Sequence, residues 1–152
     1  MGDEVEIERA RLKDAKDIGP LFAAYLKFYN RAADFKDIDL FLRARIENDE
    51  SVIYVARIAG KPVGFAQLYP SFASLALANC WILYDLFVHA EVRGRGIGLK
   101  LLEKAKSLAE ETSACEIFLQ TAKDNLRAQS LYEKAGYVRD EDFYCYSLYL
   151  KK

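Results

Sequence analysis

The chain has little of what metal sites, disulfide frameworks and membrane spans are built from. Its 152 residues include one histidine, His89, and three cysteines, Cys80, Cys115 and Cys145, an odd number without zinc spacing. We therefore expect no metal, and reduced thiols in a cytoplasmic compartment are the simplest interpretation. No apolar run reaches the roughly 20 residues of a membrane helix. The first four residues, 1–4, are acidic where a secretory signal would be basic, so neither a membrane nor export is expected.

An excess of charge of one sign is also missing. Lysine and arginine number 22 and aspartate and glutamate 23, which gives a formal net charge of −1. Without a polybasic block, a nucleic-acid partner is not expected. The length is that of one compact domain, and we find no internal repeat or linker, so residues 1–152 are predicted to form a single domain.

What is present is an alternation of strand-like and helix-like patterns. Strands are predicted at Val5–Arg11, Ser51–Ala59, Pro62–Leu68, Trp81–Val88, Cys115–Gln120 and Phe143–Leu150. Helices are predicted from Lys13–Asp14 to Phe28 or Tyr29, around Ile38–Ile46 after a polar link at Asp34–Asp39, and at Ile97–Glu111 and Asn125–Lys134. Residues Pro70–Asn79 are expected to be a loop. This βααβββαβαβ order predicts an α+β fold, with one mixed central sheet and helices on both faces.

A glycine-rich segment, Arg93–Gly98, lies between the strand Trp81–Val88 and the helix Ile97–Glu111. Glycine allows torsions closed to other residues, and the first amides of a helix are free to bind an anion. A P-loop is excluded because no Lys-Ser or Lys-Thr pair follows Gly98. A dinucleotide fingerprint is excluded because Leu99 stands where its third glycine should be. We interpret the segment as a phosphate cradle rather than a plain turn.

Two motifs resemble those of the GNAT family of acetyl-CoA-dependent N-acetyltransferases. The Arg-x-x-Gly-x-Gly pattern of Arg93–Gly98 resembles motif A. Residues Asn125–Tyr137 resemble motif B, N-x-x-A-x-x-L-Y-x-x-x-G-F, with Tyr137 in place of the final phenylalanine. The two motifs and their strands cover the C-terminal half, whereas Val5–Gln67 matches in pattern only. The resemblance implies the GNAT acyl-CoA N-acyltransferase fold, a three-layer α/β/α arrangement, and direct acetyl transfer from acetyl-CoA to a primary amine in a ternary complex.

The resemblance also implies which residues hold acetyl-CoA, the expected co-substrate. The strand end would pair with the pantetheine arm, the glycine loop would hold the pyrophosphate, and motif B would add two contacts. These residues are Leu86, Phe87, Val88, Arg93, Gly94, Arg95, Gly96, Ile97, Gly98, Asn125 and Tyr132. For the arginine side chains, solvated surface charge is the alternative. Asn125 is in addition a preferred helix N-cap, and both roles can hold together.

Acetyl transfer needs an uncharged amine, donors for an oxyanion and a proton for the departing sulfur. Tyr132 is the candidate acid, because a phenol with a reference pKa of about 10 is a donor at neutral pH. A packed core aromatic is the alternative. Some family members carry a glutamate where this chain has Tyr84. Regular alternation would send Tyr84 and Asp85 to opposite faces. Asp85 is then either a base acting through water or a structural anchor for a neighbouring backbone or arginine. Removal of the ammonium proton by a water chain, with Tyr84 lining the site, is an equally open alternative.

The acceptor is the least determined part of the prediction. In the resembled fold its slot would be lined here by aromatic and acidic residues, among them Tyr25, Tyr29 and Asp37, which can attract a cationic amine. We predict a small polyamine-like or aminoalkyl acceptor, with a protein lysine or N-terminal amine as the alternative. A non-catalytic acyl-CoA sensor is a second alternative. The aromatic strand Phe143–Leu150 further suggests a homodimer.

Overall fold

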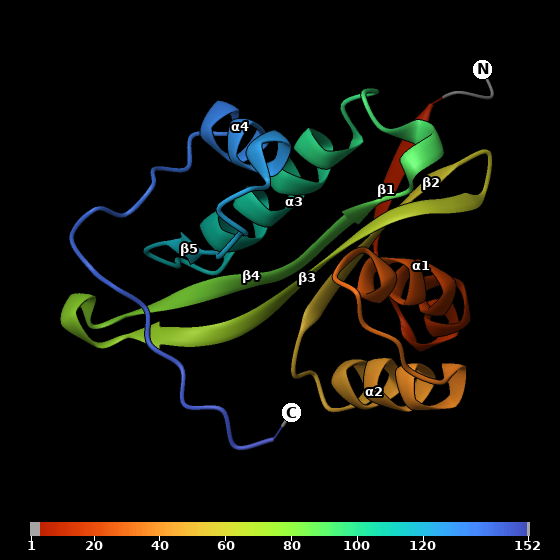
Figure 1. Ribbon diagram of the computed structural model, residues 1–152, viewed down its shortest axis with the longest axis horizontal. Helices are drawn as coiled ribbons and strands as arrows, with labels where there is room; N and C mark the ends of the chain where they lie inside the picture. Colours follow the sequence, from red (N-terminus) through yellow and green to blue (C-terminus); the bar gives the residue numbers. More distant parts are fainter. Residues whose placement is uncertain (1–3, 152) are drawn as a thin grey trace. The chain divides into compact units, whose positions relative to one another are not determined.

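The computed structural model describes residues 4–151, so most of the acidic segment at residues 1–4 lies outside the described residues. The described chain forms two compact units, one up to Gln120 and one from Thr121 onward (Figure 1). The first unit holds the whole sheet and three of the helices. The second holds one helix and an irregular segment.

The sheet has five strands in the order β1-β2-β3-β4-β5. Their bounds are Val5–Arg9 for β1, Val52–Ile58 for β2, Lys61–Ala73 for β3, Ala78–Val88 for β4 and Ile117–Phe118 for β5. The first four strands pair antiparallel and β5 pairs parallel to β4. The predicted mixed sheet of an α+β fold is therefore confirmed.

Helices α1, Ala15–Phe28, and α2, Phe35–Glu47, lie on one face of the sheet, and α3, Ile97–Glu111, lies on the other (Figure 1). Short 3-10 turns at Leu12–Asp14, Ser74–Ala76 and Ala90–Val92 are labelled η1, η2 and η3. The apolar stripe predicted for α3 is confirmed, because its five members are all buried: Ile97, Leu101, Leu102, Ala105 and Leu108. Burying such an aliphatic side chain stabilises the fold by about 1.5–3 kcal/mol.

The core between the sheet and helices α1 and α2 combines aliphatic and aromatic side chains. Ile18 and Leu42 from the helices pack with Val55, Phe65 and Phe87 from the strands. The Phe65 ring lies 5.8 Å from that of Tyr25 and 6.5 Å from that of Phe87. This aromatic contact fixes the helix face of α1 over the middle of β3 and β4.

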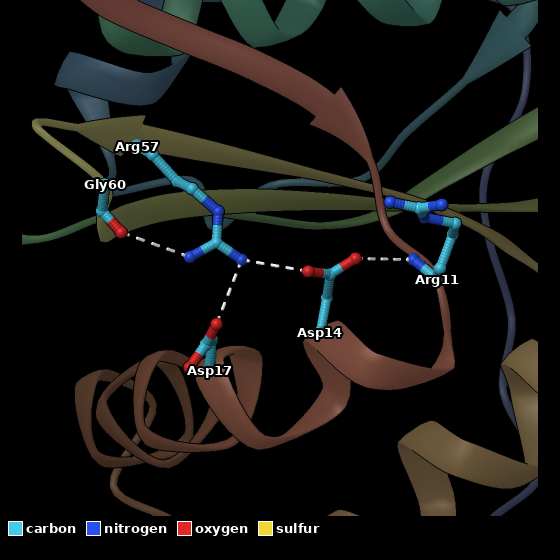
Figure 2. Close-up of polar contacts among 5 residues, drawn as sticks. All are labelled: Arg11, Asp14, Asp17, Arg57 and Gly60. Carbon is cyan, nitrogen blue, oxygen red and sulfur yellow. Dashed lines mark hydrogen bonds and ion pairs between the residues drawn. The ribbon is translucent and has the colours of Figure 1, made fainter.

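A half-buried arginine ties the start of α1 to the sheet (Figure 2). Arg57 of β2 donates through Nη2 to Asp14 Oδ1 and Asp17 Oδ2, both at 3.0 Å, and through Nη1 to the Gly60 carbonyl at 3.3 Å. The other oxygen of Asp14 accepts the Arg11 amide at 2.8 Å. One guanidinium thus joins the β2–β3 turn to the first turn of α1, and it sets where the rest of that helix lies.

Two loop predictions were wrong in the same way, because regular structure runs further than the composition suggested. The polar link at Asp34–Asp39 is mostly helix, since α2 begins at Phe35 directly after the N-cap Asp34 and its polar side chains face solvent. The predicted loop Pro70–Asn79 is mostly strand. Residues from Pro70 to Ala73 pair with Ala78 to Trp81, so a ladder of backbone hydrogen bonds carries β3 and β4 to the tip at η2.

Two strand predictions were also corrected. Only Ile117–Phe118 of the segment Cys115–Gln120 pairs with β4. The predicted strand Phe143–Leu150 is not a strand in the structure, and its large side chains are exposed. Alternating aromatic residues favour a strand only where another backbone pairs with them, and no described strand pairs with this segment.

The second unit carries helix α4, Leu126–Lys134. Asn125 is its N-cap, as predicted, and its Oδ1 accepts the Ala128 amide at 3.1 Å. The chain leaves the helix after Lys134 and its C-cap Ala135, at Gly136, whose φ of +95° belongs to the left-handed region. The Gly136 and Tyr137 amides then donate to the carbonyls of Glu133 and Tyr132. The asparagine and the glycine of motif B thus mark where the helix begins and ends.

Candidate active site

The glycine segment forms an open turn at the start of α3. Gly94 has a φ of +83° and Gly96, the N-cap residue of α3, has a φ of +78°. A Cβ added at either position would meet no atom within 4 Å. The backbone torsion, and not lack of space, therefore requires glycine here, at roughly 1–2 kcal/mol for any other residue. The open space is where a ligand can approach the backbone.

The start of α3 has the polarity of an anion site. The first hydrogen bond within this turn runs from the Lys100 amide to the Gly96 carbonyl at 3.1 Å, so the amides just before it are free of intrahelical partners. The first turn contains no acidic side chain that would repel an anion. Free amides, the positive end of a 15-residue helix and unobstructed space fit a pyrophosphate.

The two arginines of the segment lie in different environments. Arg93 is half-buried, and its Nε donates to the Val88 carbonyl at 2.9 Å. Its guanidinium carbon lies 5.7 Å from the Phe28 ring centre and 5.6 Å from that of Phe87. Arg93 therefore connects the end of β4 with the end of α1, through a hydrogen bond to Val88 and cation–π contacts with Phe87 and Phe28. Arg95 is exposed. The prediction that both side chains add charge to a phosphate site stays a prediction.

One edge of β4 is left open next to this cradle. Strand β5 pairs with β4 only at Trp81 and Ile82, although β4 continues to Val88. Beyond Ile82, no described strand covers that edge. An open strand edge offers backbone amides and carbonyls to an extended partner. That Leu86, Phe87 and Val88 line an extended ligand stays a prediction, and the Val88 carbonyl accepts the Arg93 side chain in this structure.

A β-bulge interrupts β4 at Tyr84. Gln67 pairs with Asp85 and the next residue, Leu68, pairs with Leu83, so the register passes over Tyr84. The two parts of β4 consequently face different ways. Trp81 donates to Thr112 at the end of α3 at 2.8 Å, whereas Phe87 packs in the cluster under α1. Six residues apart, the two side chains would share a face in a regular strand.

The bulge overturns the expectation that Tyr84 and Asp85 point to opposite faces. Asp85 is bonded to Gln67, and the Tyr84 ring lies 5.6 Å from that of Tyr69, two residues further along β3. Gln67 and Tyr69 share a face, so Tyr84 and Asp85 do too. Simple alternation failed because the extra residue shifts it by one position. Tyr84 is 68% exposed and Asp85 only 5%.

Asp85 is held by neutral partners. Gln67 donates to its Oδ2 at 2.7 Å, and the Tyr25 side chain also hydrogen-bonds the carboxyl. Within the described residues, no lysine or arginine forms an ion pair with Asp85. Burial raises the pKa of Asp85 above its usual 3.8, and the hydrogen bonds from Gln67 and Tyr25 oppose that rise. In place of the backbone or arginine partner considered from the sequence, Asp85 therefore has two neutral hydrogen-bond donors.

Tyrosines surround the carboxyl. The rings of Tyr25 and Tyr29 lie 5.2 Å apart, edge to face, and the Tyr25 hydroxyl donates to the Tyr84 carbonyl at 3.4 Å. Burial, and then the charge of Asp85, raise the pKa of Tyr29. The same causes raise the pKa of Tyr69 to about 12. The charge of Asp85 thus raises the pKa of one tyrosine at the end of α1 and one on β3, and this arrangement suits a cation.

The sequence prediction captured part of this cluster. It named Tyr25, Tyr29, Tyr84 and Asp85, which the structure brings together. Asp37 lies exposed in the first turn of α2, and none of the contacts above involves it. The prediction missed two buried polar residues, Gln67, which donates to Asp85, and Ser51, which donates to Gln67. The one available signal was a glutamine inside the apolar run of β3.

The remaining predicted residues belong to the second unit. Asn125 caps α4, and the ring of Tyr132 on that helix lies 5.9 Å from the ring of Tyr137. The role of Tyr132 as an acid stays a prediction. Within residues 4–151, no cluster of three His, Cys, Asp or Glu side chains could hold a metal ion. None of the described helices has the length and apolarity of a membrane span.

Known proteins are similar to this chain in sequence and in fold. The Acetyltransferase (GNAT) family profile matches residues 19–137. An uncharacterized N-acetyltransferase of Bacillus subtilis (strain 168), YhfO, is 44% identical over 144 residues, which cover 95% of this chain and 97% of that protein. The crystal structure of a probable acetyltransferase has a TM-score of 0.89 and 37% identity, covering 97% of this chain and 99% of the other. An aminoglycoside N(6')-acetyltransferase type 1 of Klebsiella pneumoniae is 27% identical over 110 residues, 65% of this chain and 53% of its own length.

Proposed function

The chain belongs to the GNAT family of acetyltransferases, and from this premise we propose that it moves an acetyl group from acetyl-CoA to a primary amine of a small cationic acceptor. The observation that carries the choice of acceptor is Asp85, a buried carboxyl lined by tyrosines and without a cationic side chain of its own. An acceptor ammonium would supply the missing positive charge. Carboxylate attraction and cation–π contacts with the rings then act together.

Acetyl-CoA, the acetyl donor of this family, supplies a thioester. We assign its pyrophosphate to the backbone amides of Arg93–Gly98 and its extended arm to the open β4 edge at Leu86 and Phe87. Support comes from the positive φ of Gly94 and Gly96 and from the unpaired edge beyond Ile82. Asn125 and Tyr132 of α4 complete the proposed set through their places in motif B.

The proposed chemistry assigns one proton transfer to each side of the reaction. Asp85 accepts a proton from the bound ammonium, directly or through one water, and so leaves a nitrogen lone pair to form the new N–C bond. Tyr132 supplies a proton to the sulfur released when the C–S bond breaks, and it regains one from solvent. The sum is an acetamide, a free thiol and one proton released. A raised pKa suits Asp85 to this task, because a carboxyl near its usual 3.8 is a weak base for an ammonium.

The cationic acceptor is proposed from the negative charge of Asp85, and the name of one relative supports it. Aminoglycosides carry several ammonium groups, and the Klebsiella pneumoniae relative is named for acetylating one of them. We therefore propose a diamine, polyamine or aminoglycoside-like compound. A homodimer through the exposed aromatic segment at residues 143–150 also remains our proposal, and light scattering at micromolar concentration tests it.

The deciding experiment measures thiol release from acetyl-CoA with a panel of diamines, polyamines and aminoglycosides. We expect turnover by the native chain and a loss of about 100-fold or more in Asp85→Asn. Glu103→Gln is the control, because Glu103 is an exposed carboxylate of α3 outside the site, and its rate is expected to equal the native rate. CoA binding without turnover on any amine would favour a protein acceptor or a sensor. Equal rates in native chain and Asp85→Asn would remove Asp85 as the base.

A further inference from the structure

Three buried side chains form a chain of hydrogen bonds that ends on Asp85. The Ser51 hydroxyl donates to Gln67 Oε1 at 2.7 Å, and Gln67 Nε2 donates to Asp85 Oδ2 at 2.7 Å. Gln67 has no exposed surface, and Ser51 is 6% exposed. Polar groups buried to this degree are retained where their hydrogen bonds are satisfied, and here each bond supports the next one.

The direction of the chain has a chemical meaning. An amide has a donor end and an acceptor end, and a carboxyl group can face either of them. Because Ser51 donates to the oxygen of Gln67, the amide nitrogen faces Asp85. A carboxylate accepts from that nitrogen. The O–H of a protonated carboxyl would find no acceptor in that nitrogen, because the amide oxygen faces Ser51.

The position of Gln67 in the sheet makes this contact rigid. Gln67 and Asp85 are opposite each other in the β3–β4 ladder, next to the bulge at Tyr84. The other groups that face the carboxyl are neutral tyrosines. Tyr25 comes from α1, Tyr29 from the position just after it, Tyr69 from β3 and Tyr84 from β4.

A cationic side chain acts on one of these tyrosines and not on the carboxyl itself. The charge of Arg45 on α2 acts on Tyr69, and Arg45 itself pairs with Glu50 at 3.2 Å. With no ion pair to hold it, the carboxylate depends on hydrogen-bond donors in its surroundings.

We propose that Ser51 and Gln67 are positioning residues that keep Asp85 ionised and oriented to receive the proton of the acceptor amine. Gln67 acts on Asp85 directly, and Ser51 acts through Gln67 by fixing which end of the amide faces the carboxyl. The inference rests on the proposed function, because it assigns the two residues to the base of that reaction.

The test compares Gln67→Leu, Ser51→Ala and Ser51→Thr with the native chain. The carboxyl signal of Asp85, identified by its absence in Asp85→Asn, is followed by carbon NMR during a pH titration. Loss of the Gln67 donor is expected to move the titration of Asp85 to higher pH. Ser51→Ala is expected to move it the same way by less, and Ser51→Thr, which keeps the hydroxyl, to restore the native curve.

The pH profile of kcat/KM gives the second readout. On its acidic limb Gln67→Leu is expected to be about tenfold slower, and the difference should close as the pH rises. A purely structural role would instead lower the rate at every pH. An Asp85 titration that is the same in native chain, Gln67→Leu and Ser51→Ala would overturn the proposal. Because the NMR titration needs no turnover, that failure is distinct from a native chain that acetylates no amine.

Discussion

Replacing Arg57 by methionine is expected to destabilise the first unit by about 2–3 kcal/mol. The substitution keeps an unbranched side chain and removes the guanidinium that binds Asp14 and Asp17. Breaking a buried ion pair from one side costs about 3–5 kcal/mol, because the remaining charge stays buried. We take less than that range, since Asp14 keeps its bond from the Arg11 amide and the Asp17 side chain is 34% exposed, where water screens it. Urea denaturation measures the change.

Arg43→Met is the matched control for this prediction. Arg43 binds Asp39 through a shorter contact, 2.8 Å against 3.0 Å, but both side chains are about 40% exposed on the surface of α2. Such a pair contributes about 0.2–1 kcal/mol. If burial decides the outcome, Arg57→Met is the more damaging change although its bonds are longer. Equal losses in the two variants, or a loss below about 1 kcal/mol for Arg57→Met, would refute the reasoning.

Two further predictions concern the site. Burial raises the pKa of Asp85 in the folded chain, so folding favours the neutral carboxyl. The contribution of Asp85 to the free energy of unfolding is therefore complete below pH 3.8, the usual pKa, and is lost as the pH rises through the folded pKa. Asp85→Asn is therefore expected to be more stable than the native chain at pH 7 and equally stable near pH 3. A difference between the two urea midpoints that is the same at both pH values would contradict this. Gly96→Ala is expected to weaken CoA binding severalfold and to lower stability by about 1–2 kcal/mol, because φ at that position is +78°. Calorimetry measures the CoA affinity and urea unfolding the stability. The control is Gly19→Ala in α1, where a methyl group meets no atom within 4 Å. A Gly96→Ala variant that binds CoA as tightly as the native chain would argue against the cradle.

Features that depend on a short stretch of chain could be predicted from the sequence. The stripe of α3 repeats at helical spacing, and its members are buried as expected. The cap of α4 is local, because the Asn125 side-chain oxygen accepts a hydrogen bond from an amide only three residues further on. The glycine segment was found for the same reason, since torsion and helix start are both local properties.

Features that depend on pairing between distant segments could not be predicted. The bulge at Tyr84 exists only in the register between β3 and β4, so alternation read along one strand placed Asp85 on the wrong face relative to its neighbour. Gln67 lies in an apolar run, and its partners Ser51 and Asp85 are 16 and 18 residues away. The segment Phe143–Leu150 has the composition of a strand, but composition does not supply a pairing partner.

The face on which Asp85 lies depends on the bulge in β4 and not on the side chain at position 84. Position 84 is exposed, so its side chain can change while the backbone still carries Asp85 and Phe87 to the α1 side of the sheet. Losing the residue altogether would restore regular alternation and leave both registers intact, because Gln67 would still pair with Asp85 and Leu68 with Leu83. Asp85 would then lie three positions after Trp81, on the opposite face and still beside Gln67. If β4 instead kept residue 84 and paired without the bulge, Asp85 would lie four positions after Trp81 and turn toward α3, away from Gln67 and the tyrosines.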